Sequence, residues 1–342
     1  MGLGRIARHC VLAAGLILMV AGGGASAAPA DTWIAAWGFV PTPLPPGLTP
    51  GARSTLPDIA PLAADIALPQ AEPVVRRPLL IDNPGNLPVE AAPGRDPSNI
   101  TVRQLVRGAV AGKRIRLRLT NEDGTDVMVL GAVHVGAAGP DGSIVAGTDH
   151  VVTFDGKSTV AVPDGAPLLS DPIDMPVDAL QRLAISLYVP GTLERGGHSL
   201  YQYVAGTPGD HTGAATLPGP SIARLTSMVS EVEVDPVSAT NVVVALGDSI
   251  TEGALSTNNA FHSWPDRLAE RLNASPAGRK WSVVNAGIGG NRLLRYGAGP
   301  SALARLDRDV LAVPGVKAVI LLEGINDIGR GFVVGGPQEP VT

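Results

Sequence analysis

Hydrophobic and polar positions alternate in the middle part of the chain. The clearest case is the segment 113–119, KRIRLRL, in which Ile115, Leu117 and Leu119 alternate with basic residues. A period of two is typical of an antiparallel strand with one buried face. Further short strands, separated by turn residues, are predicted at 127–135, 150–154, 158–162, 183–189, 200–204 and 228–234. This pattern favours a β-rich domain of the sandwich or jelly-roll-like type.

The pattern changes after Asp235-Pro236, where strands begin to alternate with amphipathic helices. The predicted order is strand 242–246, helix 264–273, strand 281–285, helix 301–311 and strand 316–322. Such an alternation predicts a parallel sheet with right-handed crossovers. Because the pattern supplies only three strands, we expect an incomplete α/β domain with a flavodoxin-like parallel sheet.

Residues 1–27 have the pattern of a secretory signal peptide. Arg5 and Arg8 precede an apolar run at 11–20, and Ala25-Ser26-Ala27 forms a cleavage motif of the A-x-A type. The apolar run is short for a membrane span. We therefore expect a secreted or periplasmic protein without a stable membrane span after cleavage. An N-terminal anchor helix is the alternative.

The composition restricts the remaining classes of protein. The chain of 342 residues has a net charge of −5, and a nucleic-acid partner is not expected, because such binders usually show a basic face. The only cysteine, Cys10, leaves with the signal peptide. The predicted division is a signal peptide at 1–27, a Pro-, Ala- and Gly-rich segment with one strand near 31–40 at 28–98, a β-rich domain at 99–235 and a partial α/β domain at 236–342.

Each of the three predicted parallel strands is followed by unusual polar residues. The first is followed by Gly247-Asp248-Ser249, the second by the glycine-rich segment 285–291, and the third by the segment 323–327, EGIND. In a parallel sheet these ends lie side by side at one edge, where open α/β sheets place their ligands. A serine hydroxyl, backbone amides and an asparagine amide would meet there. Acyl transfer needs this combination of a nucleophile and oxyanion donors.

The three segments resemble the conserved blocks of the SGNH hydrolases, also called GDSL esterases and lipases. The first block is matched by 247–251, GDSIT, with isoleucine in place of the commoner leucine; the second by 285–291, NAGIGGN; the third by 324–327, GIND. The resemblance covers about residues 240 to 330. It implies that Ser249 attacks an ester carbonyl. It also implies that the backbone N–H groups of Ser249 and Gly290 and the side-chain amide of Asn326 hold the oxyanion.

The same family uses an Asp-x-x-His block near the C-terminus as the source of its general base. No histidine follows His262 in this sequence, so this block is absent. Without a base, a serine hydroxyl is a poor nucleophile near neutral pH. Two interpretations stay open. We expect a C-terminally truncated piece of a longer esterase, and the alternative is a naturally truncated, inactive relative.

Other polar residues near these segments have simpler structural interpretations. Asp248 and Asp327 are predicted to be turn and loop-bracing residues. The histidines outside the predicted signal peptide are expected to lie in loops or strands, as at His134, His211 and His262. No cofactor or metal site is predicted, because no metal-ligand spacing such as H-E-x-x-H occurs.

The resulting prediction is a secreted serine esterase or lipase that acts on carboxylic esters, with acylated carbohydrate or lipid as candidate substrates. The alternative is an exported carbohydrate-binding protein whose hydrolase half is degenerate. The acyl and alcohol specificities and the oligomeric state stay open at this stage.

Overall fold

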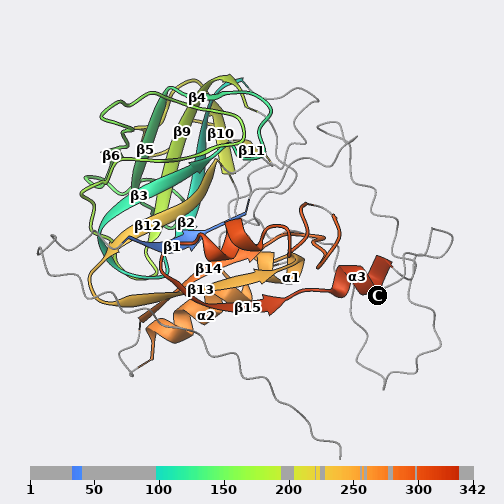
Figure 1. Cartoon of the computed structure of the whole chain (residues 1–342). Coiled ribbons are helices and arrows are strands. Elements are labelled where there is room, and N and C mark those ends of the chain that lie inside the picture. The colour runs from blue at the N-terminus through green and yellow to red at the C-terminus, as the bar shows by residue number, and fades with distance from the viewer. Residues whose placement is uncertain are drawn as a thin grey trace, which may run out of the picture. The chain divides into compact units, whose positions relative to one another are not determined.

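The computed structural model describes residues 33–40, 98–193, 204–219, 221–223, 228–254, 256–257, 260–275, 280–296 and 299–330 (Figure 1). All of these residues belong to one compact unit. The predicted signal peptide and most of the Pro-, Ala- and Gly-rich segment lie outside them. Within the described ranges, every helix is too short or too polar to cross a bilayer.

Most of the β-structure in the described chain lies in antiparallel sheets. A four-stranded sheet has the order β1 (Ile34–Gly38), β12 (Val229–Pro236), β3 (Gly112–Thr120), β8 (Pro167–Leu169). A six-stranded sheet has the order β11 (Ser221–Ala223), β10 (Val204–Pro208), β2 (Ser98–Arg107), β9 (Arg182–Thr192), β5 (Ala132–Ala137), β6 (His150–Val151). β4 (Met128–Leu130) and β7 (Val160–Val162) form a separate pair.

The alternating segment forms β3, and its buried face is the one predicted. Ile115, Leu117 and Leu119 are all fully buried. They belong to a hydrophobic cluster that also contains buried side chains of the six-stranded sheet, such as Leu187 of β9 and Val106 of β2. The apolar faces of the two larger sheets therefore share one core.

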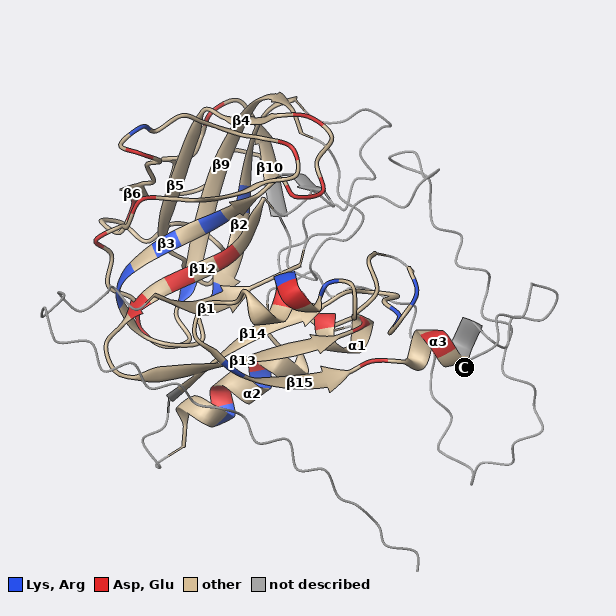
Figure 2. Ribbon diagram, in the orientation of Figure 1, with Lys and Arg blue, Asp and Glu red and all other residues tan. Residues whose placement is uncertain are grey.

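The basic residues of β3 face an acidic row on the neighbouring strand β12. Arg116 donates to Glu233 at 2.7 Å, and Arg114 donates to Asp235 at 3.0 Å. Figure 2 shows the two rows as blue bands on β3 beside red bands on β12. Glu231, on the same strand, is also buried, and burial raises its pKa to about 8, with a further increase from Glu233. The polar face of β3 is thus a paired charged layer rather than a solvated surface.

The second half of the chain forms a three-stranded parallel sheet with β13 (Thr240–Gly247) in the centre. β14 (Lys280–Gly287) and β15 (Val316–Leu322) flank it. All three strands confirm the sequence prediction. Helix α2 (Trp264–Asn273) has the predicted bounds, because Ser263 closes a capping box with Asp266 at its first turn.

The predicted helix at 301–311 is wrong in its first half. Within 301–311 only a π-helical turn, η1 (Asp307–Leu311), forms. Leu303, in the first half, is 62% exposed. The amides of Ala302 and Leu303 donate to the carbonyls of Arg292 and Leu293 in the preceding loop, at 2.9 and 3.2 Å. The hydrogen bonds that follow have irregular spacing: the Arg305 N–H donates to the Ser301 carbonyl, four residues back, and the Leu306 N–H to the Leu303 carbonyl, three residues back. No regular α-helix therefore forms before η1.

Two strand predictions need smaller corrections. The predicted strand at 127–135 is interrupted at Gly131, and its two parts, β4 and β5, join different sheets. The Gly131 N–H donates to the carbonyl of Tyr188 at 2.9 Å, and a Cβ at this glycine would lie 2.6 Å from the Tyr188 ring. In the predicted strand 200–204, only Val204 lies within the described residues, and β10 continues from it to Pro208. Strands β2, β8 and β11 were not individually predicted.

β1 connects the antiparallel and parallel sheets. It pairs with β12, and the Ala35 N–H also donates to the carbonyl of Pro314, in the turn before β15, at 3.0 Å. A Cβ at Gly38 would lie 2.5 Å from the side chain of Val284 on β14, so the two backbones approach closely. The short predicted strand around Trp37 is therefore confirmed and is part of the core.

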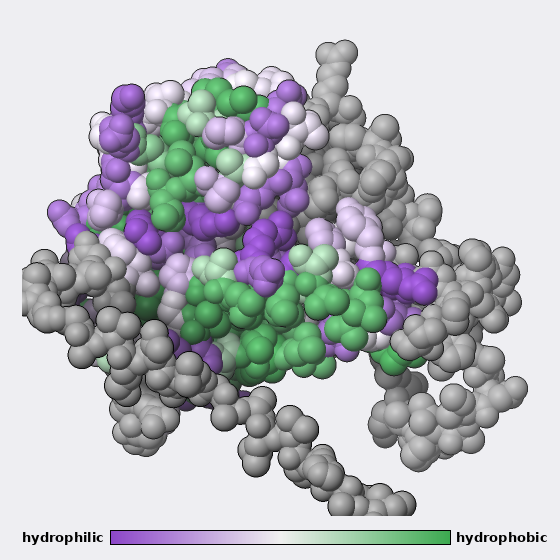
Figure 3. All heavy atoms as spheres, in the orientation of Figure 1, coloured by the Kyte–Doolittle hydropathy of each residue, from purple (hydrophilic) through white to green (hydrophobic). Residues whose placement is uncertain are grey.

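The edge strand β15 exposes apolar side chains on both of its faces. Val319, Ile320, Leu321 and Leu322 are each at least 40% exposed. Figure 3 shows a continuous hydrophobic area over this part of the molecule. Among the described strands, β15 pairs only with β13.

Candidate active site

Ser249 lies at the carboxyl end of the central parallel strand. The buried run 242–246 ends at Gly247, and Ser249 is the first residue of the short helix α1 (Ser249–Glu252). The Asp248 carboxylate accepts a hydrogen bond from the Ile250 N–H at 2.9 Å, which caps this helix. Asp248 thus has the turn and hydrogen-bonding role predicted for it. Ser249 itself is partly accessible.

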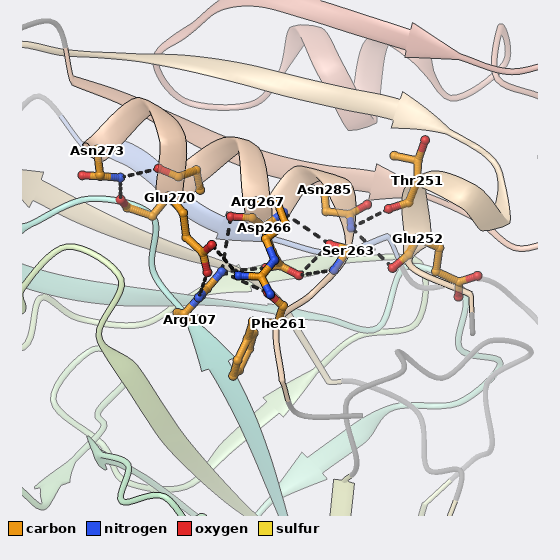
Figure 4. Close-up of polar contacts among 12 residues, drawn as sticks. Arg107, Thr251, Glu252, Phe261, Ser263, Asp266, Arg267, Glu270, Asn273 and Asn285 are labelled. Carbon is orange, nitrogen blue, oxygen red and sulfur yellow. Dashed lines mark hydrogen bonds and ion pairs between the residues drawn. The ribbon is translucent and has the colours of Figure 1, made fainter. Parts of the chain in front are cut away.

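The end of β14 holds α1 in place. The side-chain amide of Asn285 donates to the Thr251 carbonyl at 2.9 Å, and its oxygen accepts from the Gly287 N–H at 2.9 Å. Figure 4 shows Asn285 directed at the carbonyls of α1. The Ile288 N–H then donates to the Gly247 carbonyl at 3.0 Å. The first two polar segments are therefore joined by direct hydrogen bonds.

The glycines of the second segment have two different structural roles. A Cβ at Gly287 would lie 2.1 Å from the backbone nitrogen of Glu252, so only glycine lets α1 pack against β14. Gly290 has φ +73° in a turn closed by a hydrogen bond from the Asn291 N–H to the Ile288 carbonyl at 3.1 Å. This conformation favours glycine. The turn requirement explains a glycine at 290 with or without an oxyanion role.

The third segment is joined to the second. Asn326, in helix α3 (Ile325–Arg330), donates its side-chain amide to the Asn291 carbonyl at 2.9 Å. The next residue, Asp327, accepts from the Leu293 N–H at 3.0 Å and lies 3.5 Å from the Arg292 guanidinium. Asp327 therefore braces the loop, as predicted. The structure brings all three polar segments together at one sheet edge.

Glu323 is a titratable residue of this edge that the sequence analysis did not single out. Burial raises its pKa to about 7, and the nearby Asp248 carboxylate adds to the increase. Within the described part of the chain, neither of its carboxyl oxygens has a hydrogen-bond partner. Its position directly before the G-x-N-D segment is the one sequence signal that could have identified it.

A separate polar cluster lies where β2 meets α2. Arg107 of β2 forms an ion pair with Glu270 at 2.8 Å and a second with Asp266 at 3.5 Å. Its guanidinium also lies 5.1 Å from the centre of the Phe261 ring (Figure 4). A small pocket beside this cluster is lined by residues such as His262. Neither this pocket nor a second one beside Glu231 is lined by Ser249, Gly290 or Asn326.

The histidines of the described ranges have local roles. His134 Nδ1 lies 2.9 Å from the Asp149 carboxylate, and His211 Nε2 lies 3.0 Å from the Pro208 carbonyl. His262 is exposed in the loop before α2. None of the polar contacts among the described residues joins a histidine to the Ser249 hydroxyl.

Comparisons with known proteins found a family model and a solved structure that are similar to part of the chain. Residues 245–341 match the model of the GDSL-like Lipase/Acylhydrolase family. No curated protein matches the chain. A solved structure that does match is the crystal structure of AlinE4, described as an SGNH-hydrolase family esterase, with 24% sequence identity and a TM-score of 0.24. That match covers 28% of this chain and 47% of AlinE4, so it spans about half of the solved protein.

Proposed function

We propose that this chain hydrolyses carboxylic esters through an acyl-enzyme on Ser249, because residues 245–341 match the model of the GDSL-like Lipase/Acylhydrolase family. The observation that carries the proposal is the joining of three strand ends at one edge. Ser249 begins α1 there, the loop that contains Gly290 is hydrogen-bonded to Gly247, and Asn326 of α3 is hydrogen-bonded to Asn291 in that loop.

In the proposed reaction, the Ser249 hydroxyl oxygen attacks the ester carbonyl carbon and its proton passes to a base. The carbonyl oxygen becomes an oxyanion, and the backbone N–H groups of Ser249 and Gly290 and the side-chain amide of Asn326 are its donors. One N–H of the Asn326 amide already donates to the Asn291 carbonyl, which orients the other. The alcohol then leaves with a proton, and water releases the acid from Ser249. The sequence after His262 supplies no histidine, so the proposal assigns no general base.

The remaining parts of the proposal rest on the sequence alone. The signal-peptide pattern at 1–27 supports export, to the periplasm or outside the cell. The β-rich part, with its sandwich or jelly-roll-like pattern, would shape access to the ester, for which acylated carbohydrate and lipid are the candidate classes. No contact among the described residues favours the alternative, carbohydrate binding without hydrolysis.

The proposal is tested by hydrolysis of p-nitrophenyl acetate by the chain and by its Ser249→Ala variant. We expect the chain to exceed the spontaneous rate and to carry an acetyl group on Ser249 during turnover, detected by mass spectrometry of the acid-quenched protein. Ser249→Ala should carry no acetyl group in segment 247–253, and it should keep only the slower hydrolysis, about 10³-fold over water in other serine hydrolases, that oxyanion donors and binding give by themselves. Ser238→Ala, which removes an exposed hydroxyl in the turn before β13, is the matched control and should behave like the unaltered chain. Equal rates for the chain and for Ser249→Ala, or no rate above background for either, would refute the proposal.

A further inference from the structure

Arg305 is a fully buried cation beneath the three joined strand ends. Its relative exposure is 1%, and it lies in the turn that precedes η1. Burial lowers the pKa of this guanidinium, and the Asp309 carboxylate, at 3.1 Å, opposes the decrease. A buried charge is costly unless it is paired and fully hydrogen-bonded. The hydrogen-bond acceptors of Arg305 therefore indicate why a cation is buried at this place.

Every N–H group of the guanidinium has an acceptor. Nε donates to Asn291 Oδ1 at 3.1 Å, and Nη2 donates to the same atom at 3.0 Å and to the Gly247 carbonyl at 3.0 Å. Nη1 donates to the Ala286 carbonyl at 2.7 Å and to Asp309 at 3.1 Å. These bonds use the five donors that an arginine has. Only one of the four acceptor residues, Asp309, carries a charge.

The uncharged acceptors belong to the segments that carry the proposed chemistry. Gly247 lies two residues before Ser249, and Ala286 and Asn291 are in the glycine-rich segment that contains Gly290. The backbone carbonyl of Asn291 accepts the hydrogen bond from Asn326. One planar group thus links the first strand end to the second directly, and to the third through Asn291.

We propose that Arg305 is a positioning residue that sets the relative placement of Ser249, Gly290 and Asn326. This inference rests on the proposed ester hydrolysis, because it assigns Arg305 to the geometry of that site. A guanidinium fits the role because its five donors have a fixed planar arrangement. A lysine ammonium offers three donors around one point and cannot reach the same four acceptor residues at once.

Arg308 provides a matched control for Arg305. It lies one turn further along, and its side chain also donates to Asp309, at 2.6 Å, but no bond joins it to Gly247, Ala286 or Asn291. Arg305→Met and Arg308→Met therefore both remove a bond to Asp309. Only the first releases the strand ends. Arg305→Lys keeps the positive charge but lacks the planar arrangement of five N–H donors. If Arg305→Met does not fold, Arg305→Lys is the deciding variant.

The first measurement is amide hydrogen exchange of the whole chain, which needs no activity. For Arg305→Lys and Arg305→Met we expect exchange to become about 10-fold or more faster in segments 247–253 and 286–293, because local opening controls exchange there. Exchange in β3 and β9 should stay unchanged, as it should everywhere in Arg308→Met. Unchanged exchange at the strand ends in Arg305→Lys would overturn the positioning role. So would equal acceleration throughout the chain, which would indicate global destabilisation.

The second measurement is kcat and KM for p-nitrophenyl acetate. Misplacing oxyanion donors lowers turnover more than binding, so kcat should fall about 10- to 100-fold in Arg305→Lys while KM changes less than about 3-fold. If the kcat of Arg305→Lys equals that of Arg308→Met, the inference is overturned. Ser249→Ala, assayed in parallel, separates the two proposals. If it equals the unaltered chain, the ester hydrolysis proposal fails, and the exchange data still show whether Arg305 holds the strand ends.

Discussion

Glu231 illustrates how a single buried carboxyl can determine the response of this protein to pH. It is 8% exposed on β12, and one of its oxygens has no hydrogen-bond partner within the described part of the chain. Burial is the main cause of its raised pKa, about 8, and the neighbouring Glu233 adds to it. Glu233, in contrast, pairs with Arg116 at 2.7 Å. Two carboxyls on one strand therefore have opposite environments.

Glu231→Gln should stabilise the protein at alkaline pH. Between pH 4.5 and 8 the unfolded chain loses the Glu231 proton first, so the free energy of unfolding of the unaltered protein falls as pH rises. The glutamine resembles the protonated carboxyl and removes this loss. Urea unfolding at pH 5 and pH 9 should show little difference at pH 5 and an advantage for Glu231→Gln on the order of 3–5 kcal/mol at pH 9.

Glu233→Gln is the control for this prediction. It removes one partner of an ion pair on the same strand, so it should destabilise the protein at pH 7. Parallel pH profiles for the unaltered protein and Glu231→Gln would show that the Glu231 carboxyl is ionised in the folded state, contrary to the prediction.

Among the elements, α1 depends on a close approach to β14. Its four residues begin at the Asp248 cap, and the Asn285 side chain holds its last carbonyls. Gly287 permits this contact, since its Cα faces the backbone of Glu252. A helix this short has little stability of its own. Its position, and with it that of Ser249, depends on the strand beneath it.

Gly287→Ala should be strongly destabilising, because the added Cβ would meet backbone atoms that cannot move aside cheaply. We expect a loss of at least about 2 kcal/mol in the free energy of unfolding, measured by urea titration. Gly191→Ala is the matched control, since a Cβ at Gly191 of β9 meets no atom within 4 Å. Equal stability of the two variants would mean that α1 does not pack against β14 as described.

At the scale of the whole molecule, the antiparallel and parallel sheets share buried residues. One hydrophobic cluster contains Leu117 of β3 and Val244 of β13. β1 pairs with the antiparallel sheet and donates a hydrogen bond to Pro314 before β15. Arg107 adds ion pairs from β2 to α2. Because of these contacts, the stability of the predicted part 99–235 depends on that of the part 236–342, and the reverse.

The protein should therefore unfold in one transition. Differential scanning calorimetry should show a single peak whose calorimetric and van't Hoff enthalpies agree. Arg107→Met should lower the midpoint by several degrees without splitting the peak, because it removes the ion pairs that join β2 to Asp266 and Glu270 of α2. Arg267→Met is the control, since its exposed ion pair with Glu270 stays within α2 and contributes little. Two separated peaks for the unaltered protein would contradict the coupling.

The sequence by itself determined the features that depend on local pattern. Period-two alternation identified the buried face of β3, and apolar runs located all three parallel strands. The amphipathic pattern at 264–273 predicted α2, and its Ser263 cap is likewise a contact between near neighbours in the chain. The three polar segments were recognisable for the same reason, since each is a short run at the end of a strand.

The tertiary structure decided whatever depends on distant partners. Residues 302–303 are hydrogen-bonded to the loop at 292–293 in place of the predicted regular helix start, and the strand at 127–135 changes sheet at Gly131, where it passes Tyr188. Arg305 is buried against Gly247 and Ala286, and Glu231 lies on a strand between β1 and β3, so segments far away in the chain bury both groups. Hydrogen-bond partners and desolvation are set by what packs around a side chain, and no local pattern records that.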